Sequence, residues 1–459
     1  MSSPMSRFGR IARLYRGVGL ARTMLGTDLP CEFEIAHYQD GRILASCHMS
    51  SVEAFVVRVD AISELNGTVD NHYDLRAWRS CLIVAWNPGF ALASGSNVSL
   101  ILSFSEMQVC YSTESPLMAQ YSIVNCVIDG SASGDKSLKF NINDHDTHMT
   151  FTMNRISSYT KTLLWLQLTK GVSITSRITT SVLDSDNSRS LDQTIDKVCD
   201  LLSAARGTKV TWMIREHVES HGRVVARYHR ASITRPFHNF GPLPSTLDQH
   251  LPEYIRNGYS ALSSPTNLLF AAPWLIDAFV DARTELDYIQ SRGSKLAVFM
   301  EALKSASHAT QTHEPGRKNN EAGSKDTRRK SHTSLFERLN SLFEEIAFFP
   351  DKAEIELFIK SRNALVHEGQ FYVESRSSIS KGGGSALPSV FDEYVFLLNF
   401  ADRLMLHLLG YKNMYYDRRL FGRHPRPHRL VTDKHWPHPS TELKEWKPLT
   451  RDSDSETPH

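Results

Sequence analysis

The stretch Arg235-Pro-Phe-His-Asn-Phe-Gly-Pro-Leu-Pro244 separates two parts of the sequence that have different hydrophobic patterns. Its prolines neither continue a helix nor donate to the hydrogen-bond ladder of a sheet. Before this stretch, apolar residues alternate with polar ones or form short runs, which is typical of strands; after it, they recur every three or four residues, which is typical of helices. We therefore expect an α+β chain in which a β-rich, sandwich-like or barrel-like domain precedes an all-α helical bundle.

The β-rich domain is expected over residues 30–240. Asp40-Gly41 and His221-Gly222 are dipeptides that suit hairpin turns. One helical pattern, over about 191–205, interrupts the strands. Short strands separated by turn signals favour a sandwich or barrel-like sheet, to which we assign a recognition or sensor role. The β-rich segments lie at 31–35, 54–59, 98–104, 149–153 and 162–168.

The first 29 residues are rich in arginine, and the first acidic residue is Asp28. Such a start is typical of a loose basic leader, of an arm that contacts RNA or of an organelle transit peptide. We take the flexible leader over residues 1–29 as the first interpretation. The arginines that precede Asp28 are Arg7, Arg10, Arg13, Arg16 and Arg22.

Helical periodicity predicts a bundle over residues 245–420. Ser334 is a suitable N-cap for a helix that starts at Leu335, and Gly410 suits the end of the last long helix. Residues 311–333 hold six Lys or Arg and almost nothing apolar, which predicts a disordered loop. The Pro- and His-rich residues 421–459 are expected to be a polar tail. The apolar stripes run over 275–289, 296–303, 335–346, 352–367 and 391–409.

Composition places few limits on function. The 459 residues carry 52 Lys+Arg against 50 Asp+Glu, so overall charge gives no reason to expect a nucleic-acid partner. The six cysteines form no C-x-x-C pair, and no run of 18 apolar residues occurs. We expect a cytoplasmic protein with reduced thiols and no membrane contact. No phosphate-binding loop or nucleophile elbow is present, and we expect no cofactor and no metal.

The sequence of residues 352–369, KAEIELFIKSRNALVHEG, is the part most suggestive of chemistry. Placed on a helix at about 100° per residue, its apolar residues form one stripe, and Arg362 falls near the middle of that stripe. A buried guanidinium is unfavourable unless an anion meets it. The residues of the stripe are Ile355, Phe358, Ile359, Leu365 and Val366.

Asn363, His367 and Glu356 share one edge of the same helix. Histidine can transfer a proton to or from a ribose oxygen near neutral pH, and arginine can bind a phosphate. This set suits RNA cleavage without a metal, with a two-fold dimer supplying the second histidine. Alternatively, Arg362 pairs with Glu356 or with a neighbouring helix, and His367 stabilises the C-terminal end of the helix dipole.

Arg362-Asn-Ala-Leu-Val-His367 resembles the R-N-x-x-x-H form of the R-x(4–6)-H motif of HEPN domains. The segment Phe400-Ala-Asp-Arg-Leu-Met-Leu-His-Leu-Leu-Gly-Tyr411 resembles the closing helix of the ApeA-like branch of that family, found in bacterial anti-phage defence proteins. The resemblance implies a HEPN-like bundle that acts as a metal-independent endoribonuclease in abortive infection. By resemblance, Arg362 and His367 are catalytic, Asn363 assists them, and attack by the 2′-OH leaves a 2′,3′-cyclic phosphate.

The resemblance also implies partners. We expect RNA as the substrate, with tRNA among its targets. We also expect a second copy of the chain, in a homodimer or higher homo-oligomer, and a phage-derived trigger at the β-rich domain. Some HEPN domains are inactive, so the alternative is a non-catalytic module for nucleic-acid or nucleotide binding or for dimerisation. A metal-dependent nuclease is a weaker third option.

Two further segments are weaker candidates. Basic and aromatic residues alternate over 411–436, which suits single-stranded RNA or a tail that packs its aromatic residues on the bundle. Asn143-Asp-His-Asp-Thr-His148 contains metal-ligand residue types, but in the context of a polar hairpin. The expected RNA contacts in the tail are Lys412, Arg418, Arg419 and Arg423.

Overall fold

A computed structural model gives the structure of this chain. It describes residues 5, 10–50, 61–70, 72–79, 82–86, 98–128, 137–144, 147–154, 162, 164, 166, 171–181, 188–232, 237, 241–243, 245–283, 288–312, 334–377, 389–416 and 427–429. The segments 54–59 and 313–333, most of 162–168 and most of the tail, all named in the sequence predictions, lie outside these residues.

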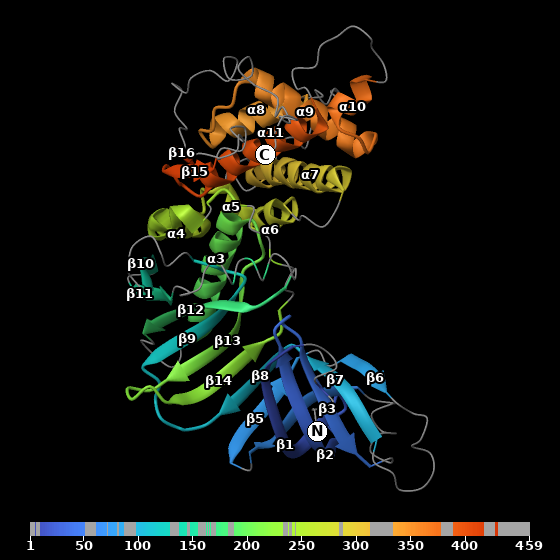
Figure 1. Ribbon diagram of the computed structural model, residues 1–459, viewed down its shortest axis with the longest axis vertical. Helices are drawn as coiled ribbons and strands as arrows, with labels where there is room; N and C mark the ends of the chain where they lie inside the picture. Colours follow the sequence, from blue (N-terminus) through green and yellow to red (C-terminus); the bar gives the residue numbers. More distant parts are fainter. Residues whose placement is uncertain are drawn as a thin grey trace, which may run out of the picture. The chain divides into compact units, whose positions relative to one another are not determined.

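The chain forms two units (Figure 1). The sheet unit comprises Met1–Cys199 and Lys209–Phe237, and the helical unit comprises Asp200–Thr208 and His238–His459. The change of hydrophobic pattern at 235–244 thus coincides with the last boundary between them. The predicted α+β class and the order of strands before helices are confirmed.

The sheet unit contains one antiparallel sheet with 14 strands among the described residues. Their order is β10-β11-β12-β9-β13-β14-β8-β5-β4-β1-β2-β3-β7-β6. The strands are β1 (Ile11–Thr23), β2 (Asp28–Tyr38), β3 (Ile43–Met49), β4 (Ile62–Val69), β5 (Tyr73–Trp78), β6 (Leu82–Trp86), β7 (Val98–Phe104), β8 (Glu106–Cys110), β9 (Met118–Val124), β10 (Ser137–Asp144), β11 (Thr147–Asn154), β12 (Ile174–Ser181), β13 (Thr211–Val218) and β14 (Val224–Arg230).

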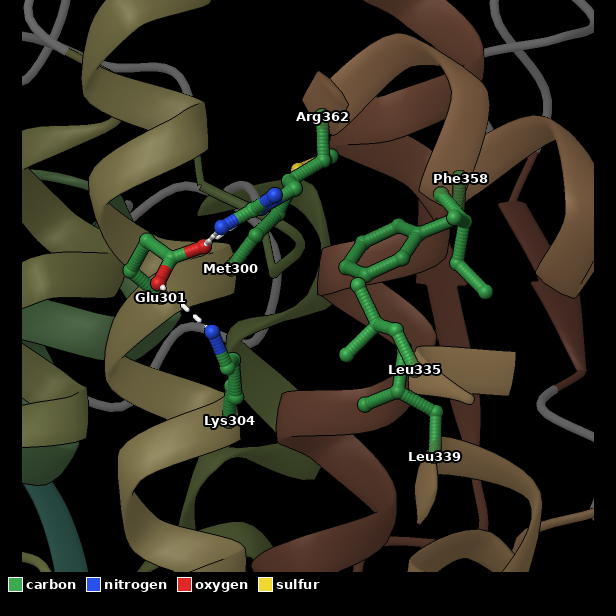
Figure 2. A pocket seen from close by; sticks show the side chains of 8 residues that line it. Met300, Glu301, Lys304, Leu335, Leu339, Phe358 and Arg362 are labelled. Carbon is green, nitrogen blue, oxygen red and sulfur yellow. Dashed lines mark hydrogen bonds and ion pairs between the residues drawn. The ribbon is translucent and has the colours of Figure 1, made fainter. Parts of the chain in front are cut away.

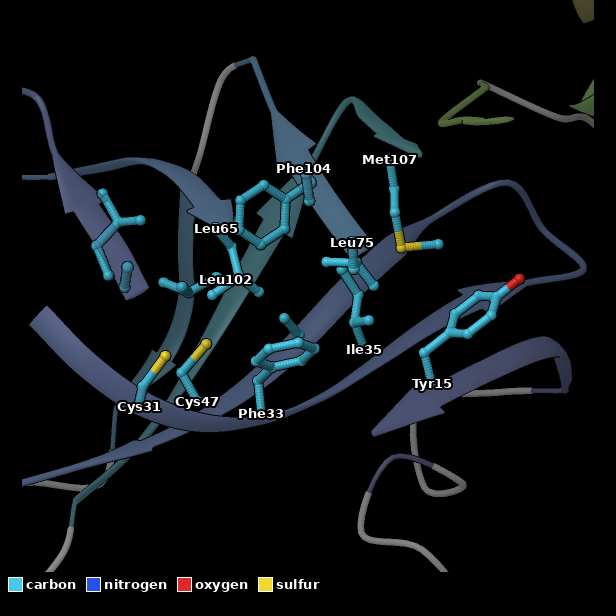
Figure 3. Close-up of a cluster of buried hydrophobic side chains, with 14 of the residues drawn as sticks. Tyr15, Cys31, Phe33, Ile35, Cys47, Leu65, Leu75, Leu102, Phe104 and Met107 are labelled. Atoms are coloured by element: carbon cyan, nitrogen blue, oxygen red, sulfur yellow. The ribbon is translucent and has the colours of Figure 1, made fainter. Parts of the chain in front are cut away.

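Seven neighbouring strands of the sheet order, from β8 to β7, share a large apolar core (Figure 3). Strands that are far apart in the sheet order contribute to this core, among them Phe33 from β2, Leu75 from β5 and Phe104 from β7. The amide N of Ser232 donates to the carbonyl of Gly41 at 3.0 Å, which joins the chain after β14 to the β2–β3 turn. The sandwich-like or barrel-like form of this sheet stays a prediction.

The two predicted hairpin turns are confirmed. Gly41, between β2 and β3, has φ of 91°, and Gly222, between β13 and β14, has φ of 82°. Residues with a Cβ rarely adopt this region, so glycine is the residue that lets the chain reverse there.

The flexible basic leader expected over residues 1–29 is wrong, because residues 11–23 form β1 in the middle of the sheet. β1 pairs with β2 on one side and β4 on the other. Tyr15 and Ala21 are buried in the core, whereas Arg16 and Arg22 pair with Glu34 and Asp28 at 2.9 and 2.8 Å. The arginines therefore occupy the exposed positions of an alternating strand.

Both units contain helices. The helix predicted over about 191–205 is α3 (Ser188–Arg206), whose last turns belong to the helical unit. The helical unit adds η4 (Ser245–His250), α4 (Leu251–Ser263), α5 (Leu268–Ala271), α6 (Trp274–Asp281), α7 (Ile289–Thr312), α8 (Leu335–Glu345), α9 (Lys352–His367), α10 (Tyr372–Ser377), α11 (Val390–Leu408) and the short strands β15 (Met414–Tyr416) and β16 (Pro427–Arg429). The single stripe predicted over 275–289 is divided, because α6 ends at Asp281 and α7 begins at Ile289.

Candidate functional site

Helix α9 carries the candidate site and has the bounds that the sequence predicts. Asp351 caps its N-terminus through a capping box with Glu354, which satisfies two of the free backbone N–H groups. The carboxylate of Glu354 also accepts a hydrogen bond from the guanidinium of Arg403 on α11 at 2.5 Å, and both side chains are buried. This pair fixes the start of α9 against α11.

The other end of α9 lies close to α7. A Cβ added at Gly293 of α7 would lie 2.6 Å from Leu365 Cδ2 and 2.7 Å from the ring of Phe371. Glycine at this position therefore lets the backbone of α7 approach α9 closely.

The predicted helix phase of α9 is largely confirmed. Ile355, Phe358 and Leu365 are buried, and the Arg362 side chain among them is only 12% exposed. Val366, expected in the same stripe, is 42% exposed.

The anion that meets Arg362 is Glu301 on α7 (Figure 2). Arg362 Nε donates to Glu301 Oε1, and a terminal nitrogen of Arg362 forms an ion pair with the same oxygen. The other terminal nitrogen of Arg362 donates to Asn363 Oδ1 at 2.7 Å. The sequence left open whether Arg362 pairs with Glu356 or with a neighbouring helix. The structure shows the pair with a neighbouring helix, α7.

A small pocket that is open to solvent adjoins this ion pair. Lys304 Nζ lies 3.5 Å from Glu301 Oε2, so one carboxylate contacts two cations. Apolar side chains of α8 and α9 form the opposite wall (Figure 2). The lining residues are Met300, Glu301, Lys304, Leu335, Leu339, Phe358, Ile359 and Arg362.

Asn363 and His367 lie on the exposed side of α9. His367 belongs to the last turn of the helix. It lies five positions after Arg362, which places the two side chains about 140° apart around the helix axis. One α9 helix therefore does not direct both side chains at a single phosphate.

Glu356, predicted to support the site, lies apart from Arg362. Its carboxylate oxygens are 4.0 Å from Lys352 Nζ and 3.7 Å from Lys360 Nζ, both on α9. The supporting acid that the sequence reasoning missed is Glu301, together with Lys304. The local sequence feature that could have pointed to them is their own spacing, a Glu–Lys pair at i and i+3 beside the core positions Phe299, Met300 and Leu303.

The segment that resembles the closing helix of the ApeA-like branch carries structural ion pairs. Asp402 and Arg283 form a fully buried pair, and Arg403 pairs with Glu354. Burial of these charges in ion pairs between elements of the bundle indicates a role in holding the bundle together.

Of the RNA contacts predicted over residues 411–436, only one lies among the described residues. Lys412 is exposed, whereas Arg418, Arg419 and Arg423 lie outside the described residues. Tyr411 and Tyr415 are fully buried, and the Tyr411 ring meets that of Tyr254 edge-on at 5.6 Å. These two tyrosines therefore pack on the bundle and are not available to stack on bases.

A second polar cluster lies inside the sheet unit. His37 Nδ1 is 2.9 Å from His229 Nδ1, and His229 Nε2 is 3.0 Å from the hydroxyl of Tyr15. Arg227 donates to the hydroxyls of Tyr15 and Tyr111 at 3.0 and 2.7 Å and pairs with Glu216 at 2.7 Å. Its members are buried or partly buried and hydrogen-bonded to one another, which is typical of a structural network.

No group of three or more potential metal ligands occurs among the described residues. In the candidate metal segment 143–148, residues 143 and 144 end β10 and residues 147 and 148 begin β11. Residues 145 and 146 lie outside the described residues. None of the described helices is long and apolar enough to cross a bilayer.

Comparison with models of known protein families, with curated proteins and with solved structures finds no match for this chain.

Proposed function

We propose that this chain is a metal-independent, HEPN-like endoribonuclease. The observation that carries the proposal is Arg362, a largely buried arginine held at a pocket by an anionic partner, on the same helix as the exposed Asn363 and His367. An enzyme that cleaves RNA through the ribose 2′-OH needs a phosphate-binding cation and a proton-transfer group, and this helix offers both.

In this proposal each residue of the motif has one role. Arg362 binds the scissile phosphate and stabilises its added charge in the transition state. His367 transfers a proton to or from the reacting oxygens, and Asn363, already bonded to Arg362, holds the guanidinium in position. The resemblance to the HEPN motif supports the same assignment.

The proposed enzyme works as a homodimer or larger homo-oligomer. Because Arg362 and His367 diverge around one helix, a phosphate reached by both requires groups from two copies of α9. A two-fold axis beside α9 would bring Arg362 of one copy towards His367 of the other.

The resemblance also supplies the setting of the proposal. The enzyme would cleave cellular RNA, tRNA included, in the cytoplasm during anti-phage defence, after the sheet unit recognises a phage-derived trigger. Lys412, Arg418, Arg419 and Arg423 are proposed to contact the RNA through its phosphates.

A non-catalytic binding or dimerisation module is the second candidate, and one observation favours it. The guanidinium of Arg362 already has a carboxylate partner in Glu301, so the α7–α9 contact is satisfied without any ligand.

The test is cleavage of total RNA and tRNA by the purified full chain in EDTA. We expect 2′,3′-cyclic phosphate ends, with the rate reduced about 10²-fold or more by His367→Ala and by Arg362→Ala. His221→Ala and Arg256→Ala, at exposed positions, are the matched controls. Cleavage that persists in both site variants would refute the proposal, as would absence of cleavage by wild type even with phage lysate added; the binding module would then be favoured.

A further inference from the structure

One carboxylate is shared by two cations beside α9 (Figure 2). Glu301 Oε1 receives the guanidinium of Arg362, and Glu301 Oε2 lies 3.5 Å from Lys304 Nζ. Asn363 Oδ1 accepts from the remaining arm of the guanidinium at 2.7 Å. The donors of Arg362 and Lys304 therefore point at one anion position.

The partners in this contact differ in their access to water. The Arg362 side chain is 12% exposed, whereas that of Glu301 is 37% exposed. Glu301 can therefore turn towards solvent while Arg362 stays in place between α7 and α9. A largely buried guanidinium then favours another anion, because an uncompensated charge is unfavourable where little water reaches it.

A phosphodiester meets the requirements of this position. It carries one negative charge and two free oxygens, which accept from a guanidinium fork and an ammonium as the two carboxylate oxygens of Glu301 do.

On the basis of the endoribonuclease function given above, we infer that Arg362 and Lys304 together form the site of the scissile RNA phosphate, and that Glu301 occupies this site until RNA displaces it. Lys304 is then a second phosphate-binding residue, and Glu301 is an intramolecular competitor that keeps the site closed in the absence of RNA.

The test measures binding separately from cleavage. The full-length protein is titrated into a labelled single-stranded 2′-O-methyl oligonucleotide, which cannot be cleaved because its nucleophilic oxygen is blocked. We expect Glu301→Gln to bind about tenfold more tightly than wild type, the equivalent of removing one competing ion pair. Glu345→Gln, which removes an exposed acid from α8, is the matched control for the change of overall charge.

Lys304→Gln tests the second cation in the same titration. We expect weaker binding, and a slope of log affinity against log salt that is about 0.7 smaller in magnitude, as expected for the loss of one phosphate contact on a single strand. Lys360→Gln, on the exposed side of α9, should leave the slope unchanged.

The inference would be overturned if Glu301→Gln bound the oligonucleotide no more tightly than Glu345→Gln. It would also be overturned if Glu301→Gln bound more weakly than wild type or did not bind. Lys304→Gln with an unchanged salt slope would do the same. Cleavage of ordinary RNA by the same variants separates the two proposals. Tighter binding by Glu301→Gln with no cleavage in any variant supports the phosphate site and refutes the nuclease. Cleavage by the wild type with no change in binding by Glu301→Gln supports the nuclease and refutes the phosphate site.

Discussion

At the scale of single residues, His37 and His229 show how strongly the interior of the sheet unit acts on charge. Burial lowers the pKa of His37 to about 3 and lowers the pKa of His229 well below its ordinary value, where the neighbouring His37 and Arg227 add to the effect. Both imidazoles are therefore neutral at neutral pH. The short contact between their Nδ1 atoms requires that one donates and the other accepts.

This pair predicts that the sheet unit loses stability in mild acid. In the unfolded chain, histidine takes up a proton near pH 6.5, whereas the folded pair does so only at much lower pH. The free energy of unfolding is therefore highest above pH 6.5 and falls by about 1.4 kcal/mol per pH unit for each histidine below that value. For His37 the fall continues to about pH 3.

Selective ¹⁵N labelling of histidine allows a direct check by NMR between pH 7 and 5, a range that lies above the titration of ordinary carboxylates. We expect the His37 and His229 signals to stay in the neutral form throughout, while urea unfolding shifts to lower urea concentration. Titration of either imidazole near pH 6.5 in the folded protein would contradict the prediction.

At the scale of elements, local patterns predicted the helices well and the sheet less well. The N-cap at Ser334, the bounds of α9 and the end of α11 just before Gly410 follow from residues within a few positions of each other. β1 was missed because its exposed arginines were interpreted as a basic cluster, and its burial depends on β4, about 45 residues away. Glu301 lies 61 residues before Arg362, so no local spacing connects the two.

The N-terminal anchor of α9 gives a prediction for this element. Glu354→Gln keeps the shape of the side chain but removes the carboxylate charge that pairs with the buried guanidinium of Arg403. We expect the free energy of unfolding of the helical unit to fall by about 3 kcal/mol, the usual effect of breaking a buried pair. Glu356→Gln, on the half-exposed side of the same helix, should change it by less than about 0.5 kcal/mol. Urea unfolding followed by far-ultraviolet circular dichroism measures both, and equal effects would contradict the prediction.

At the scale of the whole molecule, the helical unit is assembled from two separate parts of the chain. The last turns of α3, within Asp200–Thr208, belong to it. Tyr254 donates to the carbonyl of Leu201 at 2.9 Å, and Arg206 forms a buried ion pair with Asp248. Leu201 also packs where a Cβ of Gly258 would otherwise lie.

A fragment that begins at residue 238 therefore lacks part of its own core. We expect this fragment to lose about 3–5 kcal/mol from the broken Arg206–Asp248 pair alone, which is enough to unfold a marginal domain. Addition of a peptide that covers residues 188–208 should restore helical content and cooperative unfolding. A fragment that is fully folded without the peptide would show that the α3 turns are dispensable.

The division of α3 between the units also bears on how such a protein could arise and diversify. The chain passes from one unit to the other three times, after Cys199, Thr208 and Phe237. A single genetic crossover between two such genes at any one of these points would give products in which at least one unit combines segments from both parents. Exchange of one unit for another by recombination thus requires the joint transfer of residues 200–208 and the C-terminal part, so the two units are expected to be inherited together.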